Sequence, residues 1–151
     1  MLSHALSALT ARRNAVKEGE KGFTLIELLV VVIIIGILAA IAIPVYLGIQ
    51  GNAKDSAVQS DVNSAKTAVV ASLTNGGSLP AAGVVPSMSG YTGVSDASNY
   101  TTQPTLSVGS NNAFCIAAVS VTGTKYAASD TSGVTKGATC TSGVINPPTA
   151  G

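Results

Sequence analysis

A long uncharged segment near the N-terminus constrains the fold of this chain more than any other feature. The segment runs from Leu28 to Ile49, with the sequence LLVVVIIIGILAAIAIPVYLGI, and the next charged residue is Lys54. Roughly 20 apolar residues at ~1.5 Å each span the ~30 Å hydrocarbon core of a bilayer. The sequence therefore predicts one helix that crosses a membrane.

The stretch before this segment is polar and carries an excess of basic residues. Residues 1–22 contain Arg12, Arg13, Lys17 and Lys21 against Glu18 and Glu20. Positive charge is enriched on the cytoplasmic side of membrane helices, and here it lies only on the N-terminal flank. We therefore expect the N-terminus in the cytoplasm and most of the chain outside.

Three interpretations of the apolar segment compete. The first is a secretory signal peptide cleaved near Ala40-Ile41-Ala42, although its apolar region is longer than the usual length of about 7–15 residues. The second is a plain transmembrane anchor, which has no use for Glu27, because a carboxylate in a membrane helix costs free energy. The third is a precursor cut after Gly22. The new α-amine on Phe23 would then neutralise Glu27.

The residues at this junction are distinctive. Lys21-Gly22-Phe23-Thr24-Leu25-Ile26-Glu27-Leu28-Leu29 and the apolar stretch to Pro44 resemble the class III signal and N-terminal helix of type IV pilins and pseudopilins. The resemblance implies cleavage between Gly22 and Phe23 by a prepilin peptidase on the cytoplasmic face, and N-methylation of Phe23. It also implies that Glu27 guides subunit addition and axial register by pairing with the Phe23 amine of a neighbouring subunit.

The helical pattern continues beyond the apolar segment. Small and apolar residues recur every three or four positions from Ala53 to Leu73, and the charged residues Lys54, Asp55, Asp61 and Lys66 lie mostly off that stripe. Asn75-Gly76-Gly77 is a helix stop signal.

One helix is therefore expected from about Thr24 to about Leu73, with a length of ~75 Å. The remaining ~75 residues would form a domain with a radius of gyration near ~11 Å, which is too small to cover this helix. We expect its N-terminal half to lie in lipid before assembly and against other copies afterwards.

Two residues inside the predicted helix weaken it. Pro44 removes a backbone hydrogen bond and kinks or opens a helix, and Gly36 lowers helix stability. Membrane helices tolerate both residue types, which is one interpretation. In the family that the chain resembles, the matching stretch can lose helicity in the assembled filament. We favour this second interpretation, a helix break over Gly36 to Pro44.

The C-terminal part predicts an α+β fold, with the long helix packed on a small antiparallel sheet. Strands are expected at 114–121, 125–129 and 134–140, and residues 76–111 are expected to form loops or packed irregular structure. The predicted organisation is a cleaved leader at 1–22, a helix at 23–75 and a C-terminal region at 76–151. Within the helix, residues 23–49 form the transmembrane segment or filament core, and residues 50–75 form an amphipathic half.

Cys115 and Cys140 are the only cysteines. Two thiols make a poor metal site, and their spacing is not that of a C-x-x-C redox motif. In an exported domain a disulfide is the natural interpretation. The pair also matches the disulfide-bounded C-terminal region of many type IV pilins. Major pseudopilins of type II secretion usually lack it, so the cysteines favour a pilus.

Composition argues against catalysis, cofactor binding and nucleic-acid binding. His4 is the only histidine and lies in the predicted leader, so we expect neither a histidine-dependent catalytic unit nor a histidine-ligated metal site. Eight Lys and Arg against seven Asp and Glu give a net charge of +1, which speaks against a basic surface for nucleic acid. We expect no enzyme and no cofactor.

The sequence therefore predicts a structural subunit that starts as a single-pass precursor in the cytoplasmic membrane and polymerises through its hydrophobic helix into an extracellular pilus filament. The resemblance implies a prepilin peptidase, an inner-membrane platform protein and a cytoplasmic assembly ATPase as partners. Two alternatives stay open. One is a minor pilin or a pseudopilin of type II secretion or competence. The other is a membrane-anchored surface-binding protein that does not polymerise.

Overall fold

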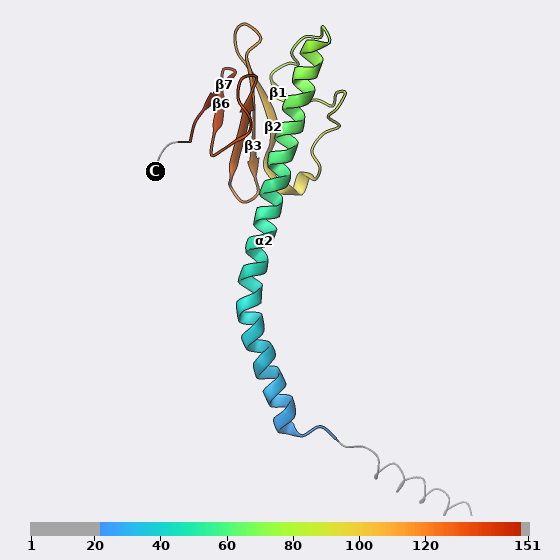
Figure 1. Ribbon diagram of the computed structural model, residues 1–151, viewed down its shortest axis with the longest axis vertical. Coiled ribbons are helices and arrows are strands. Elements are labelled where there is room, and N and C mark those ends of the chain that lie inside the picture. The colour runs from blue at the N-terminus through green and yellow to red at the C-terminus, as the bar shows by residue number, and fades with distance from the viewer. Residues whose placement is uncertain (1–21, 149–151) are drawn as a thin grey trace, which may run out of the picture. The chain divides into compact units, whose positions relative to one another are not determined.

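The computed structural model describes residues 22–148, so most of the predicted leader at 1–22 lies outside the described residues. The described chain has an α+β fold, as the sequence predicts (Figure 1). Its elements are α2 (Leu25–Thr74), β1 (Gly83–Val84), the 3-10 helix η1 (Ala97–Asn99), β2 (Tyr100–Val108), β3 (Phe114–Ser120), β4 (Lys125–Ser129), β5 (Thr135–Lys136), β6 (Thr139–Thr141) and β7 (Val144–Asn146).

Helix α2 has the predicted extent to within one residue at each end, and it ends in a Schellman motif. The Gly77 amide donates to the Ser72 carbonyl at 2.9 Å, and the Gly76 amide donates to the Leu73 carbonyl at 3.2 Å. These bonds satisfy carbonyls that the last helical turn leaves open. The motif needs a left-handed residue after the helix, and Gly76 supplies it with a φ of 79°.

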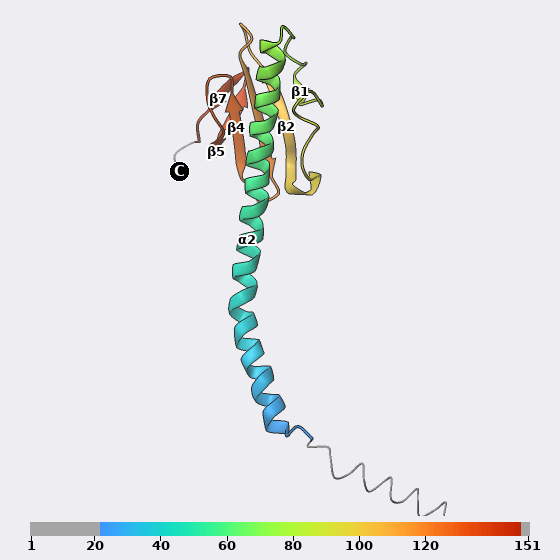
Figure 2. The same ribbon diagram turned by 45° about the vertical axis from the view of Figure 1, so that its right-hand side comes forward.

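Two antiparallel sheets follow the helix. The larger has five strands in the order β1-β2-β3-β4-β5, so its strands are neighbours in space in the order in which they follow along the chain. The smaller is the hairpin β6–β7, with Cys140 opposite Ile145. In Figures 1 and 2 the large sheet lies alongside the C-terminal half of α2, and its strands run roughly along the helix.

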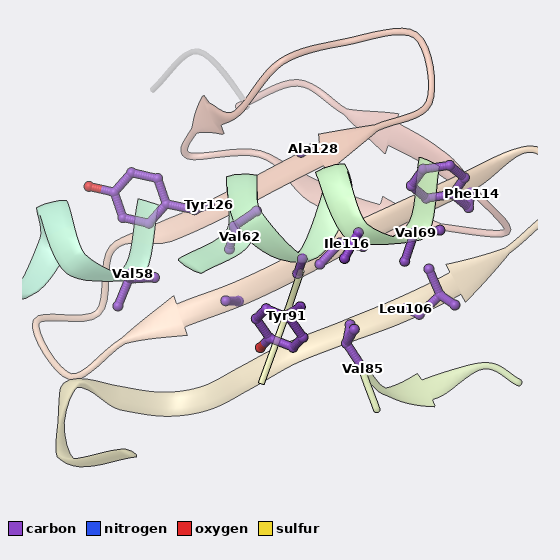
Figure 3. Close-up of a cluster of buried hydrophobic side chains, with 13 residues drawn as sticks. Val58, Val62, Val69, Val85, Tyr91, Leu106, Phe114, Ile116, Tyr126 and Ala128 are labelled. Carbon is purple, nitrogen blue, oxygen red and sulfur yellow. The ribbon is translucent and has the colours of Figure 1, made fainter. Parts of the chain in front are cut away.

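The core lies between that half of α2 and the facing side of the large sheet (Figure 3). Val58, Val62, Ala65 and Val69 are fully buried, and their spacing of three or four residues puts them on one helix face. The sheet and the loop before β2 contribute Val85, Tyr91, Leu106, Phe114, Ile116, Ala118, Tyr126 and Ala128. The amphipathic pattern of the sequence thus identifies the packed face of the helix.

A second, smaller cluster lies around Cys115, Ala127 and Ala138, with Ile145 packed against it. It attaches the hairpin β6–β7 to strands β3 and β4. The backbones at Gly109 and Gly143 lie close together: a Cβ on Gly109 would lie 2.4 Å from the Ser142 carbonyl oxygen, and a Cβ on Gly143 would lie 2.4 Å from the Gly109 nitrogen. The Gly143 amide also donates to the Ser107 hydroxyl at 3.1 Å.

Two expectations for the C-terminal part are wrong. Residues 76–111 are not all loop, because they contain β1 and the nine-residue β2. Pro104 lies within β2 and lacks the amide that a regular ladder needs. The register of β2 against β3 shifts between Thr102 and Thr105, which accommodates the proline, and the Pro104 side chain is fully buried. Because a proline inside a segment argues against a strand, sequence patterns do not predict a strand such as β2.

The prediction of one strand at 134–140 is also wrong. This segment divides into β5 and β6, which belong to different sheets. Gly137, with a φ of 80°, turns the chain between them, and its amide donates to the Lys125 carbonyl at 2.8 Å. The large sheet therefore has five strands, where the sequence predicted about three in all.

Candidate assembly site

The apolar half of α2 is the most exposed hydrophobic surface of the described chain. Every large hydrophobic side chain from Phe23 to Ile49 is between 48% and 89% exposed. By length and composition, α2 is the one described helix that could cross a membrane. A continuous apolar surface of this size marks an interaction with lipid or with other protein.

Glu27 lies in the first turn of this helix and forms a capping box with Thr24. The Thr24 hydroxyl accepts a bond from the Glu27 amide at 3.3 Å. In return, Glu27 Oε2 accepts bonds from the Thr24 amide at 2.9 Å and from the Thr24 hydroxyl at 2.8 Å. These contacts satisfy amide donors that the first turn leaves without helical partners.

Sequence reasoning assigned Glu27 to assembly and missed this capping role. The signal was present, because Thr24-Leu25-Ile26-Glu27 before an apolar run matches the pattern S/T-x-x-E. Both Thr24 bonds fall on Oε2, and a carboxylate has a second oxygen that can accept a bond from another group. Capping and a role in subunit contacts are therefore compatible.

The predicted cleavage site lies just before the helix. Gly22 and Phe23 are exposed and have no regular secondary structure. Phe23, Ile26, Glu27, Val30 and Val31 line a shallow depression of about 420 Å³. The Glu27 carboxylate thus lies on an otherwise apolar surface, where a positive charge brought by a partner would lower the cost of desolvating it.

Gly36 and Pro44 lie within α2, which is helical without interruption from Leu25 to Thr74. The kink or opening that the sequence suggests at Pro44 does not end the helix in this structure. The loss of helicity expected over Gly36 to Pro44 concerns the assembled filament, and it stays a prediction.

The two cysteines form the disulfide Cys115–Cys140, which joins β3 to β6 with a Cα–Cα distance of 5.8 Å. Cys115 is fully buried. A hairpin of two short strands is marginally stable on its own. The disulfide therefore contributes to holding β6–β7 against the large sheet.

Two aspartates on α2 have a role that sequence reasoning missed. Asp61 Oδ2 accepts bonds from the Ser95 amide at 2.8 Å, the Ser95 hydroxyl at 2.9 Å and the Tyr100 hydroxyl at 2.5 Å. Asp55 accepts bonds from the hydroxyls of Thr122 and Thr124. Both lie off the apolar stripe, so the sequence offered no reason to treat them as more than surface charges.

These contacts shift the pKa values of the groups involved. Burial raises the pKa of the Tyr100 hydroxyl, and the hydrogen bond to Asp61 and the charge of that carboxylate raise it further. For Asp55, partial burial acts to raise the carboxyl pKa. The hydroxyls of Ser120, Thr122 and Thr124 and the charge of Lys136 outweigh that effect, so the pKa of Asp55 is lowered.

Comparison with known proteins gives matches that cover only part of the chain. Residues 19–43 match the family model of the prokaryotic N-terminal methylation motif. The fimbrial protein EcpB of Eikenella corrodens is 52% identical over 58 residues, which cover 38% of this chain and 36% of that protein. The type IV major fimbrial protein FimA of Dichelobacter nodosus is 50% identical over 60 residues, 40% of this chain and 38% of that protein.

The type IV major alpha-pilin of Moraxella bovis is 49% identical over 57 residues, which cover 38% of this chain and 36% of that protein. The match to each of these three relatives thus spans less than two fifths of the relative's own length. No solved structure gives a significant match. The chain thus carries the prokaryotic N-terminal methylation motif and is similar, over about two fifths of its length, to fimbrial proteins and a pilin of the type IV class.

Proposed function

We propose that this chain is a structural subunit of a type IV pilus, and that it polymerises through the apolar half of α2. The observation that carries the proposal is the methylation motif at residues 19–43, on a helix whose large apolar side chains are about half exposed or more. The relatives are named as fimbrial proteins and a pilin, which supports a structural role and not a catalytic one.

Assembly by this route follows from burial of apolar surface. In the precursor, the side chains from Leu25 to Ile49 would lie in lipid. In the filament they would pack against the same segments of neighbouring subunits, which keeps them out of water in both states. Residues 23–49 would thus serve as membrane anchor and then as filament core.

Glu27 would make the movement of a subunit from lipid into the filament depend on its axial position relative to its neighbours. A carboxylate in an apolar filament core is costly unless a positive charge pairs with it. Cleavage between Gly22 and Phe23 creates such a charge, the α-amine of Phe23, which N-methylation leaves able to carry a proton. A subunit whose amine lies beside the Glu27 of its neighbour is then favoured over one displaced along the axis.

The partners and locations that fit this role are those of a prepilin. The chain would be a single-pass protein of the inner membrane with a cytoplasmic N-terminus, consistent with its basic N-terminal flank. A prepilin peptidase would remove residues 1–22. An inner-membrane platform protein and a cytoplasmic ATPase would drive its addition to an extracellular homo-oligomeric filament.

The first test is mass spectrometry of the N-terminal peptide from filaments sheared off the cell surface. We expect a peptide that begins at methylated Phe23, and we expect this chain to dominate the sheared material. A terminus at Ile43 would indicate ordinary signal-peptide cleavage and would refute the assembly model. An intact Met1 terminus found only in membranes would indicate a plain anchor.

A second test separates the two roles of Glu27. Glu27→Ala removes both the carboxylate and the capping box. Thr24→Ala removes the hydroxyl and its two bonds with Glu27, and it keeps the carboxylate and the bond from the backbone amide of residue 24. We expect Glu27→Ala to abolish or sharply reduce surface filaments with cleavage largely intact, and Thr24→Ala to keep them. Equal loss in both variants would show that Glu27 matters as a helix cap and not in subunit pairing.

A further inference from the structure

The residues that weaken a helix all lie in the N-terminal part of α2. Gly36, Pro44, Gly48 and Gly51 occur before Asn52, and each weakens a helix. Between Asn52 and Thr74 the sequence has neither glycine nor proline. The weak positions therefore end where the large sheet begins to cover the helix.

The turn between β3 and β4 contacts the helix at this boundary. It is closed by the Ser120 amide, which donates to the Thr124 carbonyl at 2.8 Å, and by the Gly123 amide, which donates to the Ser120 carbonyl at 2.9 Å. A Cβ added at Gly51 would lie 3.6 Å from the Thr122 methyl group. The turn thus lies over Gly51, one helical turn before Asp55.

Asp55 binds this turn with both carboxylate oxygens. Oδ1 accepts from the Thr122 hydroxyl, and Oδ2 accepts from the Thr124 hydroxyl at 2.8 Å. Hydrogen bonds to an ionised acceptor are stronger than those between neutral groups. We call these contacts the Asp55 clasp. Val58, the first buried residue of the helix, follows it by three positions.

We propose that the Asp55 clasp is the point at which unwinding of α2 from its N-terminal side stops. Unwinding as far as Gly51 breaks backbone hydrogen bonds only in the part of α2 that contains the proline and the glycines. Unwinding past Asp55 must also break two charge-assisted hydrogen bonds and then expose Val58. The segment before the clasp can therefore lose helicity while the residues after it keep theirs.

The consequence for a filament rests on the proposed function. A subunit under tension would lengthen N-terminal to the clasp, and the packing of α2 on its own sheet would be preserved. The clasp itself is a property of the single chain, so it can be tested whether or not the chain forms filaments.

The test is hydrogen–deuterium exchange of the full chain in detergent micelles, read by mass spectrometry on peptides that cover residues 46–73. In Asp55→Ala we expect the amides of residues 52–57 to exchange at least tenfold faster than in the unaltered chain. The amides of residues 62–73 should stay within about threefold, because the core and the Asp61 contacts still hold them.

Two further variants serve as controls. Asp130→Ala makes the same change of charge at an exposed turn position and should leave exchange at 52–57 unchanged. The double variant Thr122→Val with Thr124→Val removes the clasp from the side of the turn and should reproduce the effect of Asp55→Ala. If the Asp55 variant does not fold, this double variant still tests whether the clasp limits unwinding.

Two results would overturn the proposal. If the clasp variants exchange at 52–57 no faster than Asp130→Ala, the clasp does not limit unwinding. If exchange rises equally from 52 to 73, Asp55 stabilises the whole domain and marks no boundary.

Discussion

Removal of the disulfide tests how much the covalent link contributes to the stability of the C-terminal domain. The perturbation is Cys115→Ala with Cys140→Ala in the full chain. The two cysteines are 25 residues apart in the sequence. Closing a loop of that length lowers the entropy of the unfolded chain, which stabilises the folded state by about 3.5 kcal/mol at 25 °C in the chain-entropy model. That is a large fraction of the ~5–15 kcal/mol by which a domain is usually stable.

The effect should also be uneven across the domain. Strands β6 and β7 have three residues each, and their contacts with the large sheet centre on Cys115, Ala127 and Ala138. A two-stranded hairpin of this size is not stable alone. We therefore expect residues 139–146 to lose exchange protection first, while β3 and β4 remain packed on α2.

The assay is urea denaturation of the full chain in detergent micelles, followed by near-UV circular dichroism of its tyrosines. With an m-value of about 2 kcal/mol per M, the variant midpoint should fall by roughly 2 M. Reducing agent should shift the unaltered chain by a similar amount and leave the variant unchanged. A loss below about 1 kcal/mol, or equal loosening of every strand, would refute the loop-entropy argument.

Three other perturbations follow from single contacts. Tyr100→Phe removes one of three bonds to Asp61 and should cost about 1.5–3 kcal/mol in the same denaturation assay, and an unchanged midpoint would show that the bond adds nothing. Gly76→Ala forces a side chain into a φ of 79° and should cost about 1–2 kcal/mol, whereas Gly133→Ala, which has open space around it, should be nearly neutral. The folded pKa of Asp55 lies below its ordinary value of 3.8, so its stabilisation is present above that value and is lost as pH falls through the lower folded pKa. Acid titration of stability below about pH 4 should therefore be shallower in Asp55→Asn than in the unaltered chain, and identical titrations would contradict this assignment.

Features that depend on local pattern could be predicted from the sequence. The period of small and apolar residues between Ala53 and Leu73 identified the packed face of α2, and Asn75-Gly76-Gly77 identified its end. With only two cysteines, one intramolecular pairing was available, and the structure has it. The capping box of Thr24 and Glu27 is equally local, because it needs only the pattern Thr-x-x-Glu before an apolar run.

Features that depend on distant partners needed the tertiary structure. Strand β2 contains Pro104, and it forms a strand because β3 pairs with it on either side of a register shift that the proline occupies. Val134 to Cys140 looked like one strand, yet Gly137 sends its two halves to different sheets. Neither outcome follows from intrinsic strand preference, which depends strongly on the neighbours that a strand acquires.

The sequence by itself determined the membrane-length helix, its amphipathic continuation, the N-terminal methylation motif and the covalent cross-link, because each is set by residues close together in the chain or by the number of one residue type. Only the tertiary structure decided what the charges on α2 do. Asp61 meets Tyr100 across 39 residues of sequence, and Asp55 meets Thr122 across 67. A carboxylate on a helix surface has the same sequence signature whether it faces water or a hydroxyl from another element, and folding alone brings that hydroxyl within reach.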